Sequence, residues 1–180
     1  VLLPDGSHVY LNSGTTLAYP RQFKNKTRQV SLSGEAFFDV TADASNPFVI
    51  KANGALVKAV GTSFNINARE IEQHVDVFVE SGKVELMEAN NADNSVLLEP
   101  GYIGTLAQNK VNSKISEDRN CIAWKTRQME FYYTQLSEVL EILNDVYKVE
   151  IIIREPGIDT TRIIGEYNND PLDHILDVIC

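Results

Sequence analysis

Residues 1 to about 112 alternate apolar and polar residues at period two, and glycine or asparagine interrupts the pattern every few positions. Side chains of a β-strand point alternately to opposite faces, so this pattern predicts a succession of strands that each turn one face toward a core. A helix would instead repeat its apolar residues every three or four positions. The first 112 residues are therefore expected to be β-structure.

One phrase recurs within this region: an alternating strand, a glycine and a second short strand. It occurs as VSLSGEAFFDV, VKAVGTSFNIN, VFVESGKVEL and VLLEPGYIGTL, with glycines at positions 34, 61, 82 and 101, and LPDGSHVYLNSGTTLAY resembles a degenerate fifth copy. Such repeats favour an antiparallel β-roll or a β-helix-like domain, in which glycine permits the bends. A sandwich or a jelly roll also fits, because period two does not separate these architectures.

Composition limits the classes of function. A chain of 180 residues that is 43% hydrophobic can bury one large core or two small ones. Its net charge of −9 leaves no basic surface for a nucleic acid, so we expect no nucleic-acid partner. No apolar run approaches the ~20 residues of a membrane-spanning helix. The chain begins inside a strand-like phrase and ends within a helical one, so we expect it to be part of a longer protein.

The phrase GEAFFDV raises the question of catalysis, because a carboxylate beside phenylalanines is the setting of a general acid. Alternation places Glu35 and Phe37 on one face of the strand, and Phe38 and Val40 on the face toward the core. The other copies carry threonine, lysine or tyrosine at the position of Glu35, and no second catalytic group can be nominated. We predict that Glu35 is structural, bonding a turn amide or pairing with Arg28, and that the protein has no catalytic residue and is not an enzyme.

Cysteine and histidine give no sign of a metal or cofactor site. Cys121 and Cys180 lie too far apart for a metal knuckle or a redox motif, and their apolar neighbours favour two buried thiols over a disulfide. The three histidines share no i, i+4 spacing. We therefore expect no metal and no cofactor.

The period-two rhythm stops in the polar stretch SKISEDRNCIAWKT. We predict a linker at residues 113–126, between an all-β domain of residues 1–112 and a small α+β domain of residues 127–180. Trp124 is expected to plug the junction between the two domains, because a large ring buries much area.

The last third of the sequence is predicted to run strand, helix, strand, strand, helix. MEFYY is a short strand, and Thr134 offers an N-cap to the helix that follows. VEIII from Val149 and TRIIGEY from Thr161 are β-runs on either side of the turn REPGIDT. Asp170 would cap a second helix, and the closing strand of this two-helix α+β fold is expected beyond Cys180.

Five phrases together resemble the periplasmic domain of FecR-type anti-sigma factors over residues 2 to about 108. They are LPDGSHVYLNSGTTLAYP, VSLSGEAFFDV, PFVIKANGALVKAVGTSFNIN, VESGKVEL and LLEPGYIGTL. One departure is GYIGTL, where these proteins tend to carry glutamine after the glycine. MEFYYTQLSEVLEILNDVYKVEIII and RIIGEYNNDPLDHILDVI resemble the short domain at the N-termini of secretins and TonB-dependent transducers, which also ends many FecR-like proteins.

The resemblance implies a role in signal transduction. FecR-like proteins look like relays that cross the inner membrane once: a cytoplasmic segment holds an extracytoplasmic-function sigma factor, and the periplasmic part receives a signal from an outer-membrane TonB-dependent transducer. This chain would be the periplasmic receiver. Its expected partners are the N-terminal signalling domain of the transducer and, through a cytoplasmic segment outside this chain, the sigma factor. It would meet the membrane only through a span that also lies outside it.

A small sheet with an open edge can accept a strand from a partner, and VEIII and TRIIGEY are the candidate edges. Residues of the types found at interaction sites lie on or beside these strands. The predicted partner-binding residues are Tyr132, Ile151, Ile153, Arg162, Ile164, Glu166 and Tyr167.

Two other classes of function remain open. A carbohydrate-binding β-module would need aromatic side chains in a row on one solvent face, and the candidates are Tyr10, Tyr19, Phe37 and Phe78. Their positions in the period-two alternation do not place them all on the same face, so this alternative ranks second. A glycosidase ranks behind it, because the acidic residues are spread along strands and turns without a motif.

Overall fold

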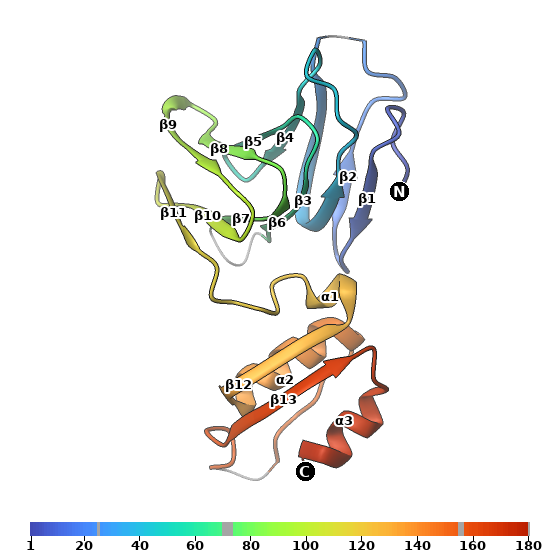
Figure 1. The fold of residues 1–180 in the computed structure, drawn as a ribbon, viewed down its shortest axis with the longest axis vertical. Coiled ribbons are helices and arrows are strands. Elements are labelled where there is room, and N and C mark those ends of the chain that lie inside the picture. Colours follow the sequence, from blue (N-terminus) through green and yellow to red (C-terminus); the bar gives the residue numbers. More distant parts are fainter. Residues whose placement is uncertain (25, 70–73, 155–156, 180) are drawn as a thin grey trace. The chain divides into compact units, whose positions relative to one another are not determined.

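The structure is a computed structural model, and it describes residues 1–24, 26–69, 74–154 and 157–179. The chain divides into two compact units, Val1–Glu117 and Asp118–Cys180. The first consists of strands, and the second combines two strands with three helices in its described part (Figure 1). The predicted class, mainly β followed by a small α+β unit, is confirmed. In the described part of the chain, none of the helices has the length and apolar character needed to cross a membrane.

One sheet of eleven strands forms the described part of the first unit. The strands hydrogen-bond in the order β11-β10-β7-β6-β3-β4-β5-β8-β9, with β1 and β2 also paired to β3. Neighbours are antiparallel except for β3 and β4, which run parallel. The strands are β1 (His8–Leu11), β2 (Thr16–Ala18), β3 (Arg28–Asp39), β4 (Phe48–Ala52), β5 (Ala55–Ala59), β6 (Ser63–Ala68), β7 (His74–Ser81), β8 (Val84–Glu88), β9 (Asn91–Leu98), β10 (Tyr102–Ala107) and β11 (Lys110–Ile115).

The long strand β3 belongs to two parts of this sheet. Up to Ser33 it pairs with β2 and β4, and from Gly34 onward it pairs with β6 and β1. Gly34 has a φ of 105°, and a Cβ built on it would lie 2.7 Å from Oγ1 and 2.8 Å from Cα of Thr15. Only glycine both adopts this positive φ readily and leaves room for Thr15, because it has no Cβ. Gly34 is therefore the bend that the repeats predicted.

The core of the first unit lies between the two parts of the sheet. Phe38 is fully buried and stacks on Phe64 with ring centroids 5.4 Å apart, and Val40 lies in the same cluster, as predicted. Phe37 points to the opposite face, yet it is also buried and meets the ring of Tyr10 edge-on. Both faces of β3 are therefore covered. Each buried phenylalanine contributes about 1.5–3 kcal/mol through the area it removes from water.

Side-chain hydrogen bonds join the two ends of the strand order. Asn94 on β9 donates from Nδ2 to the carbonyl of Asn109 (2.9 Å), and the amide of Val111 on β11 donates to Oδ1 of Asn94 (3.2 Å). The sheet thus comes close to closing on itself. Closure shields the outer edges of β9 and β11, which would otherwise present unpaired backbone groups.

The second unit pairs β12 (Gln128–Gln135) with β13 (Arg162–Asn168) in an antiparallel sheet, accompanied by three helices: α1 (Ala123–Thr126), α2 (Leu136–Tyr147) and α3 (Leu172–Ile179). The apolar stripe of α2 is buried as its spacing predicted, through Leu136, Val139, Leu140, Leu143 and Val146. These side chains share one core with Met129 and Phe131 of β12 and Ile175 of α3. The predicted linker 113–126 includes the end of β11 and all of α1.

The strand predicted at Val149–Ile153 is wrong. Residues 149–154 follow α2 without forming a strand, although Ile151 and Ile153 pack half-buried against the core. The amide of Ile151 donates to Oδ1 of Asn144 (2.7 Å), so a side chain of the preceding helix takes a donor that a β-ladder would use. High β-propensity was overridden by this local bond.

Smaller expectations also change. The helix α2 has Gln135 as its N-cap residue, whereas Oγ1 of Thr134 accepts a bond from the amide of Tyr132. The carboxylate of Asp170 accepts from the amide of Asn168, upstream of α3. Cys121 is half-buried, as is Trp124, and Cys180 lies outside the described residues.

Candidate interaction site on the second unit

Glu35 is built into the first unit as a structural acceptor. It is 5% exposed, and its carboxylate accepts from Nδ2 of Asn12 (2.8 Å), Nδ2 of Asn65 (2.8 Å) and a guanidinium nitrogen of Arg69 (2.7 Å). The expected pairing with Arg28 is wrong, because Arg28 bonds to Asp5 at 2.7 Å. Three donors hold the carboxylate in place, as a buried charge requires.

The described residues hold no group of three or more His, Cys, Asp and Glu that could bind a metal ion. The aromatic residues considered for sugar binding do not form a row either. Phe37 is buried, Phe78 is half-buried, and the exposed Tyr10 and Tyr19 lie on and after different strands, β1 and β2.

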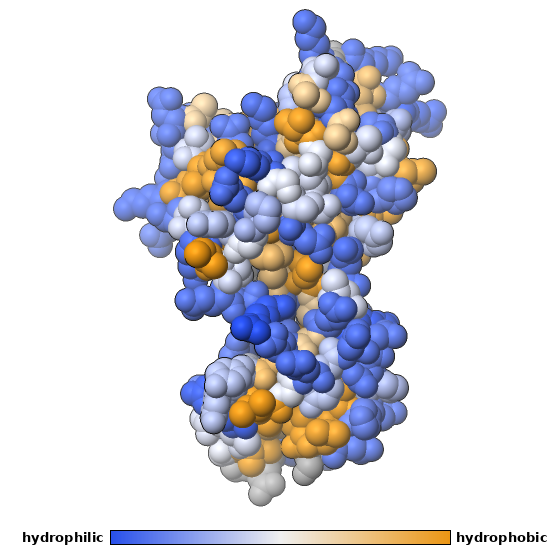
Figure 2. Space-filling view, viewed as in Figure 1, coloured by the Kyte–Doolittle hydropathy of each residue, from blue (hydrophilic) through white to orange (hydrophobic). Residues whose placement is uncertain are grey.

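The two-stranded sheet of the second unit turns one face outward. Tyr132 pairs with Ile164, and Glu130 pairs with Glu166, so these four side chains share a face. Tyr132 is 75% exposed and Ile164 is 60% exposed, which is unusual for a large aromatic residue and an isoleucine side by side. Tyr133 adds a second exposed ring at a bulge and meets the ring of Tyr132 edge-on. We call Glu130, Tyr132, Ile164 and Glu166 the outer face of the β12–β13 sheet; the space-filling view shows apolar patches on the second unit (Figure 2).

The backbone of β12 does not offer a free edge. The amide of Asn169 donates to the carbonyl of Arg127 (2.9 Å), and antiparallel ladders alternate, so the amides of Gln128, Glu130 and Tyr132 point away from β13. Each of the three already has a partner: Oγ1 of Thr126 (3.2 Å), Oδ1 of Asn120 (2.8 Å) and Oγ1 of Thr134 (3.2 Å), respectively. Local side chains therefore cap this edge.

The edge of β13 is different. By the same alternation, the amides of Ile164, Glu166 and Asn168 point away from β12. Asn168 donates to the carboxylate of Asp170 at 2.8 Å, whereas the structure records no acceptor for Ile164 or Glu166 among the described residues. These two amides lie two positions apart, which is the spacing a further strand needs. We call them the β13 edge.

The outer face is apolar at one end and acidic at the other. Arg119 forms an ion pair with Glu130, and its hydrogen bond and charge hold the pKa of that carboxyl below its ordinary value. Glu166, across the sheet, has no such partner among the described ion pairs. A hollow of about 470 Å³ lies here, lined in part by Arg119, Glu130, Glu166 and Asp170. A ligand for this end must therefore tolerate or neutralise negative charge.

The structure brings together three of the predicted partner-binding residues, Tyr132, Ile164 and Glu166. Arg162 is exposed on the same strand, and its guanidinium donates to the carbonyl of Tyr133 (3.0 Å). The other three residues do not belong to the outer face. Ile151 and Ile153 pack on the core outside any strand, and Tyr167 is 8% exposed with its ring near that of Phe131.

Sequence reasoning missed the capped edge and the bulge. The residues that decide which edge is open are Asn120, Thr126 and Thr134, each of which bonds a neighbouring amide of β12. A serine, threonine or asparagine beside a strand is a weak signal, because such residues are also common in turns and caps.

Comparison with known proteins places the chain among regulators. Residues 1–85 match the family model described as FecR protein, and residues 128–180 match that of the FecR C-terminal region. Two crystal structures of a putative anti-sigma factor from Parabacteroides distasonis, at 1.65 and 2.50 Å resolution, are similar over 99% of this chain and 84% of theirs. Both are 32% identical in sequence, with TM-scores of 0.76 and 0.75. No curated protein matches the chain.

Proposed function

The chain belongs to the FecR family of anti-sigma factors, and from that membership we propose that it is the periplasmic, signal-receiving region of such a factor. In this proposal the second unit binds the N-terminal signalling domain of an outer-membrane TonB-dependent transducer. The signal then passes to an extracytoplasmic-function sigma factor, which is held by a cytoplasmic segment outside this chain, beyond a membrane span. The protein acts through binding and not through catalysis.

The observation that carries the proposal is the β13 edge beside an apolar outer face. Two amides for which no described residue is an acceptor, with two carbonyls of the same strand, give affinity for an added strand without specifying its sequence. Tyr132 and Ile164 supply the side-chain contacts that give such a contact its specificity, and tyrosine is a residue type enriched where binding energy concentrates.

Charge defines the kind of surface that fits. Residues 118–180 carry twelve Asp and Glu against six Lys and Arg, and Glu166 lies on the outer face itself. A transducer domain with basic residues around an edge strand would be attracted, and the rate of association would fall with added salt. An acidic partner would be repelled.

The test is a set of proline substitutions in the β13 edge. Ile164→Pro and Glu166→Pro each remove one outward amide that no described residue uses, so folding, followed by circular dichroism, should persist in at least one of them. Binding to the transducer domain, measured by titration calorimetry, should weaken by about two- to tenfold for each lost main-chain bond. A matched control is Gln128→Pro, which removes an outward amide of the capped β12 edge and should leave affinity unchanged.

A side-chain variant completes the design. Tyr132→Ser removes an exposed ring from the outer face without touching the core, and we expect at least about a tenfold loss of affinity if the ring anchors the partner. If folded variants of β13 and of Tyr132 all bind the transducer domain like the wild type, while substitutions in residues 1–117 abolish binding, the receiver is the first unit and the proposal is wrong.

A further inference from the structure

The segment that follows β2 and ends at the first residue of β3 is the most basic part of an acidic protein. Arg21, Lys24, Lys26 and Arg28 occur within eight consecutive positions, and no Asp or Glu lies between Tyr19 and Gly34. The whole chain has a net charge of −9, so this segment is positively charged within a protein that is negatively charged as a whole. A local positive potential attracts anions regardless of the overall charge.

Three of these four cations are available to a ligand. Arg28 is buried and committed: it pairs with Asp5 and donates to the carbonyls of Asn46 and Thr41. Arg21, Lys24 and Lys26 are exposed, and the structure records no ion pair between them and any described residue. Among the described residues, no acidic side chain pairs with these charges, so an anionic ligand can replace the solvent ions around them.

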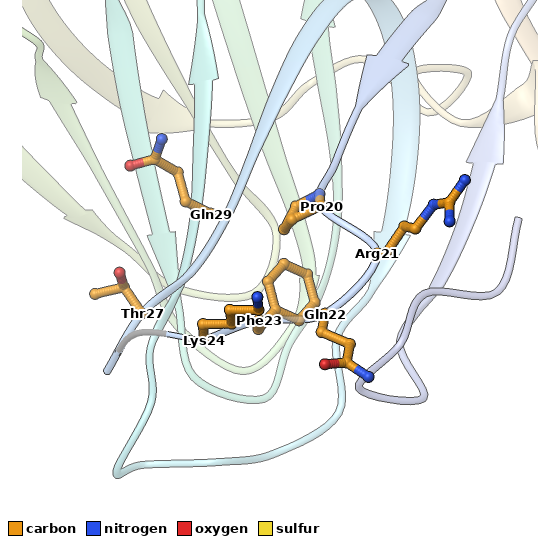
Figure 3. Close-up of a pocket in the computed structure, with 7 residues that line it drawn as sticks. All are labelled: Pro20, Arg21, Gln22, Phe23, Lys24, Thr27 and Gln29. Carbon is orange, nitrogen blue, oxygen red and sulfur yellow. The ribbon is translucent and has the colours of Figure 1, made fainter.

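A cavity of about 800 Å³ opens on this segment. It is lined by Pro20, Arg21, Gln22, Phe23, Lys24, Thr27 and Gln29. This volume falls within the range of small-molecule sites, roughly 300–1,000 Å³. In Figure 3, Phe23 lies at the centre of the labelled side chains, with Thr27 and Gln29 to one side and Arg21 and Gln22 to the other.

The lining defines the chemistry of the ligand. The ring of Phe23 packs edge-on against the buried ring of Phe48, with 6.2 Å between the ring centroids. This contact fixes the ring of Phe23 in the wall of the cavity. Gln22, Thr27 and Gln29 add amide and hydroxyl groups that hydrogen-bond with alcohols. A fixed ring with amides suits a sugar, and two cations suit its carboxylates. The described residues that line the cavity include no carboxylate, histidine or thiol.

We propose that this cavity binds an acidic oligosaccharide, with Arg21 and Lys24 taking its carboxylates and Phe23 stacking on a ring. A single inorganic ion would fill only a small part of the volume, and a neutral sugar would leave the two cations unused. The site belongs to the first unit, so it stands whether or not the second unit binds a transducer. It would let the protein respond to a ligand of its own.

The first test compares two ligands with the same rings and different charge. The whole 180-residue chain is titrated by calorimetry with an oligogalacturonate and with its fully methyl-esterified form. We expect saturable binding of the acid, and binding about tenfold weaker or more for the ester, which has lost the charged acceptors. Equal binding of both forms, or binding of neither, overturns the proposal.

Matched variants locate the site. The double variant Arg21→Gln/Lys24→Gln should lose the binding, and Phe23→Leu, which retains an apolar side chain against the core, should weaken it while the fold persists by circular dichroism. Lys110→Gln/Lys114→Gln removes the same charge from exposed positions of β11 and should bind normally. If both double variants weaken binding equally, diffuse charge and not this cavity is responsible, and the proposal fails.

Two further probes test the class of ligand. Poly-glutamate carries carboxylates without rings, and vesicles of phosphatidylglycerol carry phosphate at a membrane surface. We expect both to bind at least about tenfold more weakly than the oligogalacturonate, because neither offers a ring to Phe23. If either binds as well or better and the Arg21→Gln/Lys24→Gln variant loses that binding, the segment recognises an acidic peptide or a lipid surface, and the sugar assignment is wrong.

Discussion

At the scale of single residues, Glu35 shows how a buried acid can be structural. Its carboxylate accepts hydrogen bonds from Asn12, in the loop after β1, from Asn65 on β6, and from Arg69 just after β6. Glu35 therefore connects these three parts of the chain. Glu35→Gln replaces the charged carboxylate, which accepts from Asn12, Asn65 and Arg69, by a neutral amide. The NH2 group of that amide is a donor and cannot accept their hydrogen bonds. We expect a loss of about 1–3 kcal/mol in the free energy of unfolding, measured by urea denaturation, and unchanged partner binding.

The control for this prediction is Glu80→Gln, at an exposed position of β7, which should change stability by less than about 0.5 kcal/mol. A Glu35→Gln variant that folds like the wild type but loses a measurable hydrolytic activity would show that the carboxylate is catalytic after all.

The buried Arg28 pairs with the half-buried Asp5, and this ion pair makes stability depend on pH. Burial alone would raise the pKa of Asp5, but hydrogen bonds from Ser7 and Arg28 outweigh it, so the pKa lies below its ordinary 3.8. A depressed pKa means that the stabilisation is complete above the ordinary value and is lost as the pH falls through the lower, folded-state value. Thermal unfolding followed between pH 5 and about pH 2 should show this loss.

Asp5→Asn should remove that part of the acid sensitivity. It should also cost about 3–5 kcal/mol at neutral pH, because Arg28, only 4% exposed, would keep its charge without the carboxylate. Asp93→Asn, at an exposed position of β9, should leave the pH profile unchanged. A profile that stays steep in Asp5→Asn would assign the acid sensitivity to other carboxylates.

These pairings mark the limit of sequence analysis at this scale. Alternation correctly put Phe38 and Val40 in the core and left Glu35 on the opposite face. It chose the wrong arginine for Glu35, because the choice depends on the register of β3 against β6, which brings the chain after Ala68 beside Gly34. Register follows from packing across the whole sheet and is not written in any one strand.

At the scale of elements, Gly34 decides whether β3 can serve both parts of the sheet. Gly34→Ala imposes a φ of 105° on a residue with a Cβ and drives that Cβ into Thr15. We expect a loss of about 3 kcal/mol or more, since backbone strain of about 1–3 kcal/mol adds to the clash. Chemical denaturation measures it.

Gly101→Ala separates the two contributions. Gly101 also has a positive φ, 83°, but open space surrounds its Cβ position. This variant should lose only about 1 kcal/mol, from backbone strain alone. If both variants lose the same amount, the contact with Thr15 is soft and the bend does not depend on it.

Elements were predictable where a long pattern decided them and not where a local bond did. The stripe of α2 follows from its period, and the strands on either side of Gly61, Gly82 and Gly101 follow from glycine spacing, whereas Gly34 bends a single strand. Val149–Ile153 has the composition of a strand, but Asn144 takes one of its amides. TRIIGEY was predicted as a candidate edge, but which of its backbone amides lack an acceptor among the described residues could not be predicted, because Arg162–Asn168 has the same sequence pattern whether its outward amides are bonded or not.

At the scale of the whole molecule, each unit has a core of its own. The core residues of the first unit run from Leu3 to Leu106, and those of the second from Ala123 to Ile175. A fragment of residues 1–117 should therefore fold alone, with a cooperative thermal transition and the far-ultraviolet signature of β-structure. We propose these two units as independent domains.

A shorter fragment is the control. Residues 1–98 lack β10 and β11, which leaves the edge of β7 unpaired and removes Leu106 from the core, so this fragment should not fold cooperatively. An unfolded 1–117 fragment beside a folded full chain would show that the first unit needs the second.

The capped edge of β12 limits how many strands can be added to the β12–β13 sheet. A sheet with two free edges can add strands on both sides and grow into a filament, whereas here Asn120, Thr126 and Thr134 occupy one side. Once a partner strand lies along β13, the described part of the β12–β13 sheet offers no second open edge. If the proposed function is right, each molecule should bind one partner at a time through this sheet, and the strength of the signal would follow the number of molecules with a bound partner and not the size of a cluster.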